Sequence, residues 1–183
     1  MSYITEHRQK FDDLNSKINN PESLRRNSNG GNTILFSYPP DEEFLYIDEA
    51  KKLYSEKGIF IDISKLMVKF IEEEGWDSFS EFYQSMESSP HKVFYDEDAE
   101  ETDLFDLIIA EIEKASSAGK IPFLIRTGSL YGTGIENVTI MENRVVMKLR
   151  NPVVIFYPST IREDNLYFLN FKPASKYRCT LVK

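Results

Sequence analysis

The turn after the first apolar run stands where sheet-and-helix proteins often bind phosphate. Residues 33–38 form an unbroken run typical of a buried strand, and a helical pattern follows from residue 41. A phosphate site at such a turn needs glycines, whose N–H groups approach the anion, and usually a lysine. Here Pro39 and Pro40 lack N–H donors, and the carboxylates of residues 41–43 repel an anion. The turn therefore argues for a protein that works by binding another protein.

A second turn, Gly128–Gly134, is rich in glycine and also follows a predicted strand. A Walker loop has glycines five residues apart followed by Lys and Ser or Thr, whereas the fifth residue after Gly128 is Thr133 and no lysine follows. A dinucleotide fingerprint has glycines at offsets zero, two and five, whereas this turn has them at zero, four and six. The spacing favours a flexible or partner-contacting loop. The alternative is a divergent nucleotide- or metal-dependent enzyme that uses the Gly128–Gly134 turn together with Asp62.

The residues that most often ligate metals or act as nucleophiles are few and scattered. His7, His91 and Cys179 are too far apart in sequence to suggest a metal site, and no serine stands in a Gly-x-Ser-x-Gly motif. Asp62 ends a predicted strand, where a carboxylate can bind Mg²⁺, but a position near the start of the next helix is the preferred interpretation. The acidic residues 96–101 lack the glycine of a calcium loop. We therefore expect no catalytic residue, no cofactor and no metal.

Charge and hydropathy restrict the partners and the location of the protein. The net charge of −8 and the pI of about 4.9 argue against direct nucleic-acid binding. Arg25 and Arg26 are a candidate for a local basic patch, but two adjacent arginines more often form a solvated corner of the surface. No apolar run is long enough to span a bilayer, so no membrane association is expected. The first residues lack the basic and apolar regions of a secretion signal, which predicts a cytoplasmic location.

The elements that position these residues alternate between strands and helices. Fully apolar strands are predicted at residues 33–38, 59–63, 122–127 and 152–157, and helices at 3–18, 41–57, 64–75, 76–86, 103–118 and 135–149. Such strands separated by helices predict an α/β fold with a largely parallel sheet and helices on both faces. Alternating runs at residues 165–171 and 177–182 predict a C-terminal antiparallel edge hairpin or edge strands. We expect one α/β domain over residues 1–183, with helix 3–18 packing on its core.

The order of short motifs along the chain is similar to that of a known protein family. These motifs are Phe36-x-Tyr38-Pro39-Pro40-x-Glu42-Glu43, the strand end Thr127-Gly128, Val153–Pro158, Leu166–Leu169 and Tyr177-Arg178. From about Phe11 to the C-terminus, this pattern resembles the BrxB-like family of BREX, the bacteriophage-exclusion defence systems of bacteria. The stretch Gly128–Gly134 departs from the pattern, because it is more glycine-rich than the family leads one to expect.

The resemblance implies a small, non-catalytic BREX component with a three-layer α/β fold. That fold would be similar to P-loop NTPases but without a phosphate loop. The resemblance also implies that the protein binds PglZ, the phosphatase-superfamily protein of the system, and further its ATPase and methyltransferase. The family has no established catalytic residues to carry over to this sequence.

The sequence and the resemblance together predict a cytoplasmic adaptor, or scaffold, in an anti-phage complex. Its partner contacts are expected at strand ends, where open α/β sheets place function. The candidate contacts are Tyr38, Pro39, Pro40, Tyr131, Tyr157 and Tyr167.

Overall fold

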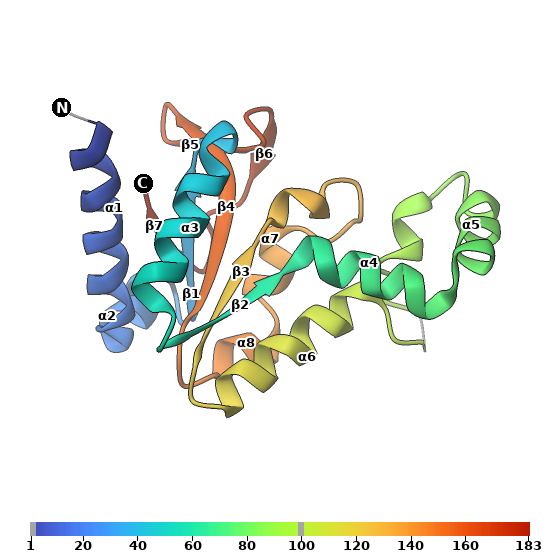
Figure 1. Ribbon diagram of the computed structural model, residues 1–183, viewed down its shortest axis with the longest axis horizontal. Helices are drawn as coiled ribbons and strands as arrows, with labels where there is room; N and C mark the ends of the chain where they lie inside the picture. The colour runs from blue at the N-terminus through green and yellow to red at the C-terminus, as the bar shows by residue number, and fades with distance from the viewer. Residues whose placement is uncertain (1–2, 99–100) are drawn as a thin grey trace.

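Five parallel strands form the centre of the computed structural model, which describes residues 3–98 and 101–183 (Figure 1). Their order across the sheet is β2-β3-β4-β1-β7. The strands are β1 (Thr33–Tyr38), β2 (Gly58–Asp62), β3 (Ile121–Ile125), β4 (Val153–Arg162) and β7 (Cys179–Val182). The predicted α/β fold with a largely parallel sheet is therefore confirmed.

Helices cover both faces of this sheet, and each face has its own cluster of buried side chains. One face is covered by α1 (Tyr3–Ile18), α2 (Pro21–Asn27) and α3 (Glu43–Tyr54). The other is covered by α4 (Ile63–Glu74), α5 (Trp76–Ser85), α6 (Leu104–Ser117), α7 (Asn137–Met141) and α8 (Arg144–Lys148). Of these, α5 lies beyond the sheet, at the outer end of α4 (Figure 1).

The buried strands explain why the sequence shows runs rather than alternation of apolar residues. All six residues of β1 are buried, with Ile34 and Phe36 in the cluster under α1 and α3 and Leu35 in the opposite cluster. Phe36 stacks on Phe156 of β4 with ring centroids 4.7 Å apart. A strand whose two faces are both covered is apolar along most of its length, which is the pattern of a parallel sheet.

Strand β4 continues beyond the sheet into an antiparallel arm. It pairs with β1 as far as Pro158 and then with β5 (Asn165–Phe168), which pairs in turn with β6 (Lys172–Ala174). The strand predicted over residues 152–157 therefore ends too early, since β4 continues through Pro158 to Arg162. Pro158 lies opposite Tyr38, the last residue of β1, so its missing N–H falls where the parallel ladder ends.

The two alternating runs at the end of the chain form two kinds of strand. The first run contributes β5, in the predicted antiparallel hairpin, and the second becomes β7, a parallel edge strand beside β1. The β4–β5 turn uses Glu163 and Asp164, both with positive φ (48° and 64°), as a tight hairpin turn requires.

Two of the predicted helices have other bounds in the structure. The helix expected over residues 41–57 begins at Glu43, after a 3-10 helix at Pro40–Glu42, and ends at Tyr54, before Gly58 begins β2. The expected helix over residues 135–149 is two short helices, because the Asn143 side chain accepts from the Val145 N–H at 2.9 Å and so starts α8.

None of the helices in the described part of the chain has the length and apolar character needed to cross a bilayer.

Candidate functional site

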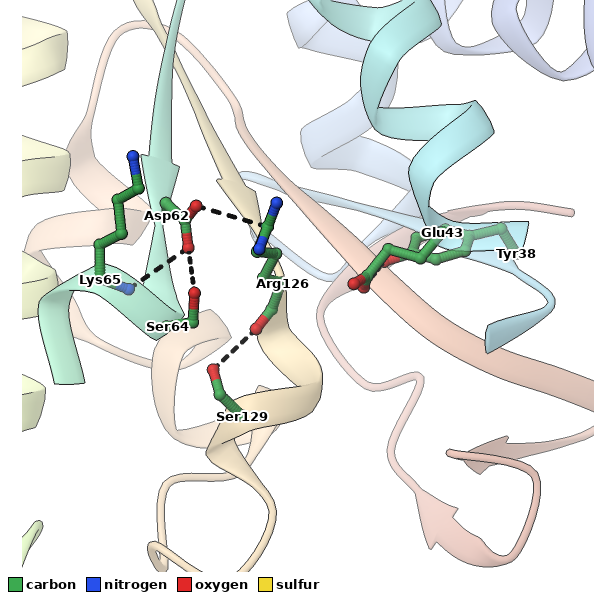
Figure 2. A network of polar contacts seen from close by, with 7 residues as sticks. All are labelled: Tyr38, Glu43, Asp62, Ser64, Lys65, Arg126 and Ser129. Carbon is green, nitrogen blue, oxygen red and sulfur yellow. Dashed lines mark hydrogen bonds and ion pairs between the residues drawn. The ribbon is translucent and has the colours of Figure 1, made fainter. Parts of the chain in front are cut away.

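The carboxyl edge of the sheet, where the parallel strands end, brings together polar side chains from three strands and the segments that follow them (Figure 2). Tyr38 ends β1, Asp62 ends β2, and Arg126 follows β3 directly. Open α/β sheets place their functional groups at this edge. The edge is therefore the candidate functional site.

The turn after β1 is closed by its own side chains. Tyr38 is fully buried, and its hydroxyl donates to Oε2 of Glu43 at 2.8 Å (Figure 2). Burial, reinforced by the Glu43 carboxylate, raises the pKa of Tyr38 well above its usual range, so the phenol remains a donor at physiological pH. The hydrogen bond holds the Glu43 carboxylate at the position that an anion would need.

The backbone of the same turn offers few donors to a ligand. Pro39 and Pro40 have no N–H, and the Glu42 N–H donates to the Pro39 carbonyl at 2.9 Å. His7 Nε2 lies 3.4 Å from Oε2 of Glu42. This arrangement agrees with the interpretation of the turn as unsuited to phosphate.

Lys10 of α1 also reaches this end of β1. Its Nζ donates to the Ser37 carbonyl at 3.3 Å and lies 5.1 Å from the centroid of the Tyr46 ring. Burial lowers the pKa of Lys10, and the nearby Glu6 and Glu42 carboxylates partly oppose that shift. The lysine therefore holds α1 against the end of β1 instead of facing the turn as a free cation.

Asp62 connects the end of β2 to both α4 and Arg126 (Figure 2). Its Oδ1 accepts from Ser64 Oγ at 2.6 Å and from the Lys65 N–H at 3.3 Å, and its Oδ2 lies 3.4 Å from Nε of Arg126. The preferred interpretation of Asp62, a carboxylate at a helix start, is confirmed, because it is the N-cap of α4. Both of its oxygens are engaged by protein groups.

Arg126 is a residue of this edge that sequence reasoning missed. It has left-handed backbone geometry (φ 57°), which is uncommon for a residue with a side chain. Ser129 Oγ donates to its carbonyl at 2.8 Å, and the ion pair with Asp62 holds its Nε (Figure 2). The side chain is half exposed, and its two terminal nitrogens have no partner among the residues that the structure describes. The one signal for Arg126 in the sequence is that a basic residue directly follows an apolar strand.

The Gly128–Gly134 turn uses its backbone donors internally. It begins as a 3-10 helix, η3 (Thr127–Leu130), anchored by the bond from Thr127 Oγ1 to the Phe156 carbonyl at 2.6 Å. The N–H groups of Tyr131 and Thr133 donate to carbonyls within the same segment at 3.1 Å. A phosphate cradle needs several N–H groups that converge on one point, and these point into the loop.

Two hollows at this edge differ widely in size. The cavity lined by η3, Tyr157 and Phe168 has a volume of about 20 Å³, room for one water. A second hollow, lined by Asp62, Lys65 and Ile125, has a volume of about 270 Å³, close to the roughly 300 Å³ of a small-molecule pocket. Across residues 3–98 and 101–183, no group of three or more His, Cys, Asp or Glu side chains could hold a metal ion.

Two of the expected partner contacts, Tyr38 and Tyr157, are buried. Tyr38 lies under α1 and α3, and Tyr157 stacks on Phe168 of the arm with centroids 4.6 Å apart. Their neighbours fill both positions, so neither ring is available to a partner. Burial raises the pKa of Tyr157 as well.

The remaining expected contacts differ in exposure. Pro39, Pro40 and Tyr167 are half-buried, whereas Tyr131 is 54% exposed. Their role in partner binding stays a prediction.

Phe171 is the second residue of this edge that the sequence did not reveal. It is 58% exposed and meets Tyr131 edge to face, with ring centroids 5.4 Å apart. The sequence placed Phe171 in a strand, whereas Leu169 and Asn170 have positive φ (49° and 70°) and turn the chain before it. The turn displays the ring beside the loop that carries Tyr131.

A model of the family described as BREX protein BrxB matches residues 59–182 of the chain. The match covers more than half of the chain, from β2 to β7, and includes Asp62, Arg126, Tyr131 and Phe171. The helices α1 to α3 and the central strand β1 lie outside it. No curated protein and no solved structure matches the chain.

Proposed function

We propose, since the chain belongs to the BrxB family of BREX proteins, that it is a non-catalytic adaptor in an anti-phage defence complex. Its direct partner in this proposal is a PglZ-like protein of the phosphatase superfamily. The BREX ATPase and methyltransferase are further expected members of the same assembly.

One observation carries the proposal: the exposed Tyr131–Phe171 pair lies in the same region as the partly free Arg126 guanidinium. Tyr131 directly follows η3, which begins just after Arg126, so one short rigid segment carries both groups. Aromatic rings and arginine are the side chains that most often dominate the binding energy of protein interfaces. We name Arg126, Tyr131 and Phe171 the carboxyl-edge contact surface.

The rest of the edge supports binding rather than turnover. Both oxygens of Asp62 are held by Ser64, Lys65 and Arg126, and Oε2 of Glu43 is held by Tyr38. A carboxylate that acts as a general base needs an oxygen within reach of the substrate, and both oxygens of Asp62 are already engaged. The half-buried Pro39, Pro40 and Tyr167 are expected at the margin of the contact surface.

The test is co-purification of the chain with the PglZ protein encoded beside it, comparing the wild type with the double variant Tyr131→Ala/Phe171→Ala. Loss of a buried interface anchor costs about 2 kcal/mol or more, so we expect the double variant to bind at least 30-fold more weakly. Both rings are exposed in the free protein, so folding is expected to persist, which circular dichroism checks.

The matched control is Trp76→Ala, which removes a 68%-exposed aromatic ring on α5, far from the carboxyl edge. We expect it to bind as the wild type does. Loss of PglZ binding in this control but not in the double variant would move the interface to α5. Failure of the wild type to bind PglZ at all would reject the adaptor proposal.

The enzyme alternative is tested by thermal denaturation with ATP, GTP and Mg²⁺. A ligand at a hundred times its Kd adds about 2.7 kcal/mol to the free energy of unfolding, whereas we expect no shift. A nucleotide-dependent shift that is lost in an Asp62→Asn variant would favour the alternative.

A further inference from the structure

The amino edge of the sheet, where the parallel strands begin, carries a row of basic side chains. Lys57 directly precedes β2, Lys120 directly precedes β3, and Arg150 stands shortly before β4. Since β2, β3 and β4 are neighbours, these cations lie at successive strand starts. The helices α2 and α8 add further basic residues at the same end (Figure 1). We name the whole set the amino-edge cations: Arg25, Arg26, Lys57, Lys120, Arg144, Lys148 and Arg150.

Side-chain amides bind the segments that carry these cations to one another. Asn32, fully buried before β1, donates from Nδ2 to the Leu149 and Asn151 carbonyls at 2.9 and 3.0 Å. The Asn151 amide donates to the Lys120 carbonyl at 3.1 Å, and Arg25 donates from α2 to the Leu149 carbonyl at 2.7 Å. The row is therefore displayed by a fixed framework that joins α2, β3 and the loop before β4.

Most of these cations have no anionic partner within the protein. Arg26, Lys57, Arg144, Lys148 and Arg150 are exposed, and none of them forms an ion pair with a residue in the described ranges. Elsewhere on the surface, the exposed cations Lys52, Lys69, Lys92, Lys114 and Arg126 do form ion pairs. The charge of the amino edge is therefore available to an anion from outside.

The helix dipole explains the positions of only some of the amino-edge cations. Arg25, Arg26 and Lys148 stand in last turns of helices, where the dipole favours a cation. Arg144 instead opens α8, where the dipole disfavours one, and Arg150 lies on a loop. These two side chains gain nothing from a helix end.

The whole chain is acidic although its amino edge is basic, because acidic and basic residues are concentrated in different segments of the chain. Residues 63–117 contain fifteen Asp and Glu against four Lys, whereas residues 120–183 contain ten Lys and Arg against four Asp and Glu. The first of these segments builds α4 and α5, which project from the molecule, and α6, which lies against the sheet beside α8 (Figure 1). An argument from net charge against polyanion binding therefore does not apply to the amino edge.

We propose that the amino edge binds the phosphate backbone of a nucleic-acid duplex. The starts of β2, β3 and β4, at about 4.8 Å spacing, extend over roughly 10 Å, and the cations of α2 and α8 lengthen the row toward the roughly 12 Å width of a major groove. Among the exposed aromatic rings of the described chain, only Tyr177 borders this edge, at its β7 end. Single-strand binding relies on stacked rings and protein interfaces rely on aromatic anchors, so the composition favours duplex phosphates.

The experiment measures binding of the full chain to a fluorescent 20-base-pair duplex between 50 and 200 mM KCl. The slope of log K against log salt is about −0.9 for each phosphate contacted, so we expect a slope of about −3 to −5. The triple variant Arg26→Gln/Arg144→Gln/Arg150→Gln is expected to bind at least tenfold more weakly at 50 mM KCl. Its slope is expected to be shallower by about 2 to 3.

Two matched triples control for charge and for folding. Replacing Arg26, Arg144 and Arg150 by Lys keeps the charge and is expected to keep most of the binding. Replacing Lys65, Lys69 and Lys92 of the projecting side by Gln removes the same charge elsewhere and is expected to leave binding unchanged. Equal loss in this second triple would overturn the proposal.

The remaining outcomes are equally decisive. A wild type that does not bind the duplex but self-associates through Arg26, Arg144 and Arg150 would identify the acidic segment of a second copy as the occupant and overturn the proposal. Binding to a single strand but not to the duplex would overturn it too. The Gln triple is expected to bind PglZ normally, since the amino edge and the carboxyl-edge contact surface lie at opposite ends of the strands.

Discussion

Asp62 has two roles, one for each carboxylate oxygen. Its Oδ1 caps the start of α4, and its Oδ2 pairs with Arg126. The first of these roles follows from local sequence, because a carboxylate before an apolar helical pattern is a typical N-cap. The second depends on the β2–β3 register, which sets Asp62 beside Ile125 and hence next to Arg126. The sequence shows both residues but not that pairing, and so the guanidinium of the proposed contact surface was missed.

Substitutions of Asp62 separate the two roles. Asp62→Ala removes the cap and the ion pair and is expected to lower the free energy of unfolding by about 1–2 kcal/mol. Asp62→Asn keeps a capping oxygen and loses only a pair whose arginine is half exposed, so it is expected to cost less than about 1 kcal/mol. Urea denaturation measures both values. Equal losses in the two variants would mean that the cap contributes nothing.

The exposed aromatic residues show the same limit of sequence reasoning. Tyr38 ends β1, Tyr131 follows the end of β3, and Tyr157 lies inside β4, yet only Tyr131 is exposed. Tyr46 of α3 packs against Tyr38 with ring centroids 5.4 Å apart, and Phe168 of the arm stacks on Tyr157 at 4.6 Å. Exposure of an aromatic ring at a strand end therefore depends on packing that local patterns do not contain.

Strands were predicted more accurately than helix boundaries. A fully apolar run such as residues 33–38 has few alternatives to a buried strand, and the structure places β1 there. Residues 135–149 have a helical period, but Asn143 competes for the backbone with its own side chain and divides the segment. The extension of β4 past Pro158 required knowledge of where its neighbour β1 ends.

The start of α6 was predicted well because its signal is local. Asp103 accepts from the Asp106 N–H at 2.9 Å, and Asp106 accepts from the Asp103 N–H at 3.3 Å, which forms a capping box. Burial raises the pKa of Asp103, although the bond from the Asp106 N–H opposes that shift. The cap therefore combines a favourable hydrogen bond with an unfavourable burial of charge.

Two variants of Asp103 test this combination. Asp103→Ala loses the cap and is expected to lower the free energy of unfolding by about 1 kcal/mol at pH 7, whereas Asp103→Asn keeps it. The folded wild type binds a proton at Asp103 more tightly than the unfolded chain does. Its stability relative to Asp103→Asn is therefore expected to rise as the pH falls from 7 toward 4.

The comparison of wild type with Asp103→Asn cancels the other carboxylates, which both proteins share. Chemical denaturation at pH 4, 5, 6 and 7 provides the measurement. A relative stability that falls with falling pH would show that the folded state lowers the pKa of Asp103 instead.

At the scale of the whole molecule, the family match begins after the strand that holds the sheet together. β1 lies between β4 and β7, and all six of its residues are buried. β7 pairs with no other strand of the sheet than β1. The matched residues 59–182 therefore contain both neighbours of β1 but not β1 itself.

We expect residues 1–183 to fold as one unit and residues 59–183 alone to remain unfolded. Without β1, β4 loses one neighbour, β7 loses its ladder, and the apolar cluster under α1 and α3 has no cover. Dispersion of amide signals in an NMR spectrum distinguishes the outcomes, with the full chain prepared in the same way. A dispersed spectrum from the shorter chain would show that the domain is divisible.

The continuity of β4 also has a mechanical consequence. One unbroken backbone passes from the middle of the parallel sheet to the tip of the arm, with no loop between them. The arm therefore has no loop at its base about which it could rotate relative to the sheet. A load applied to the β4–β5 turn would be transmitted along that strand directly to β1.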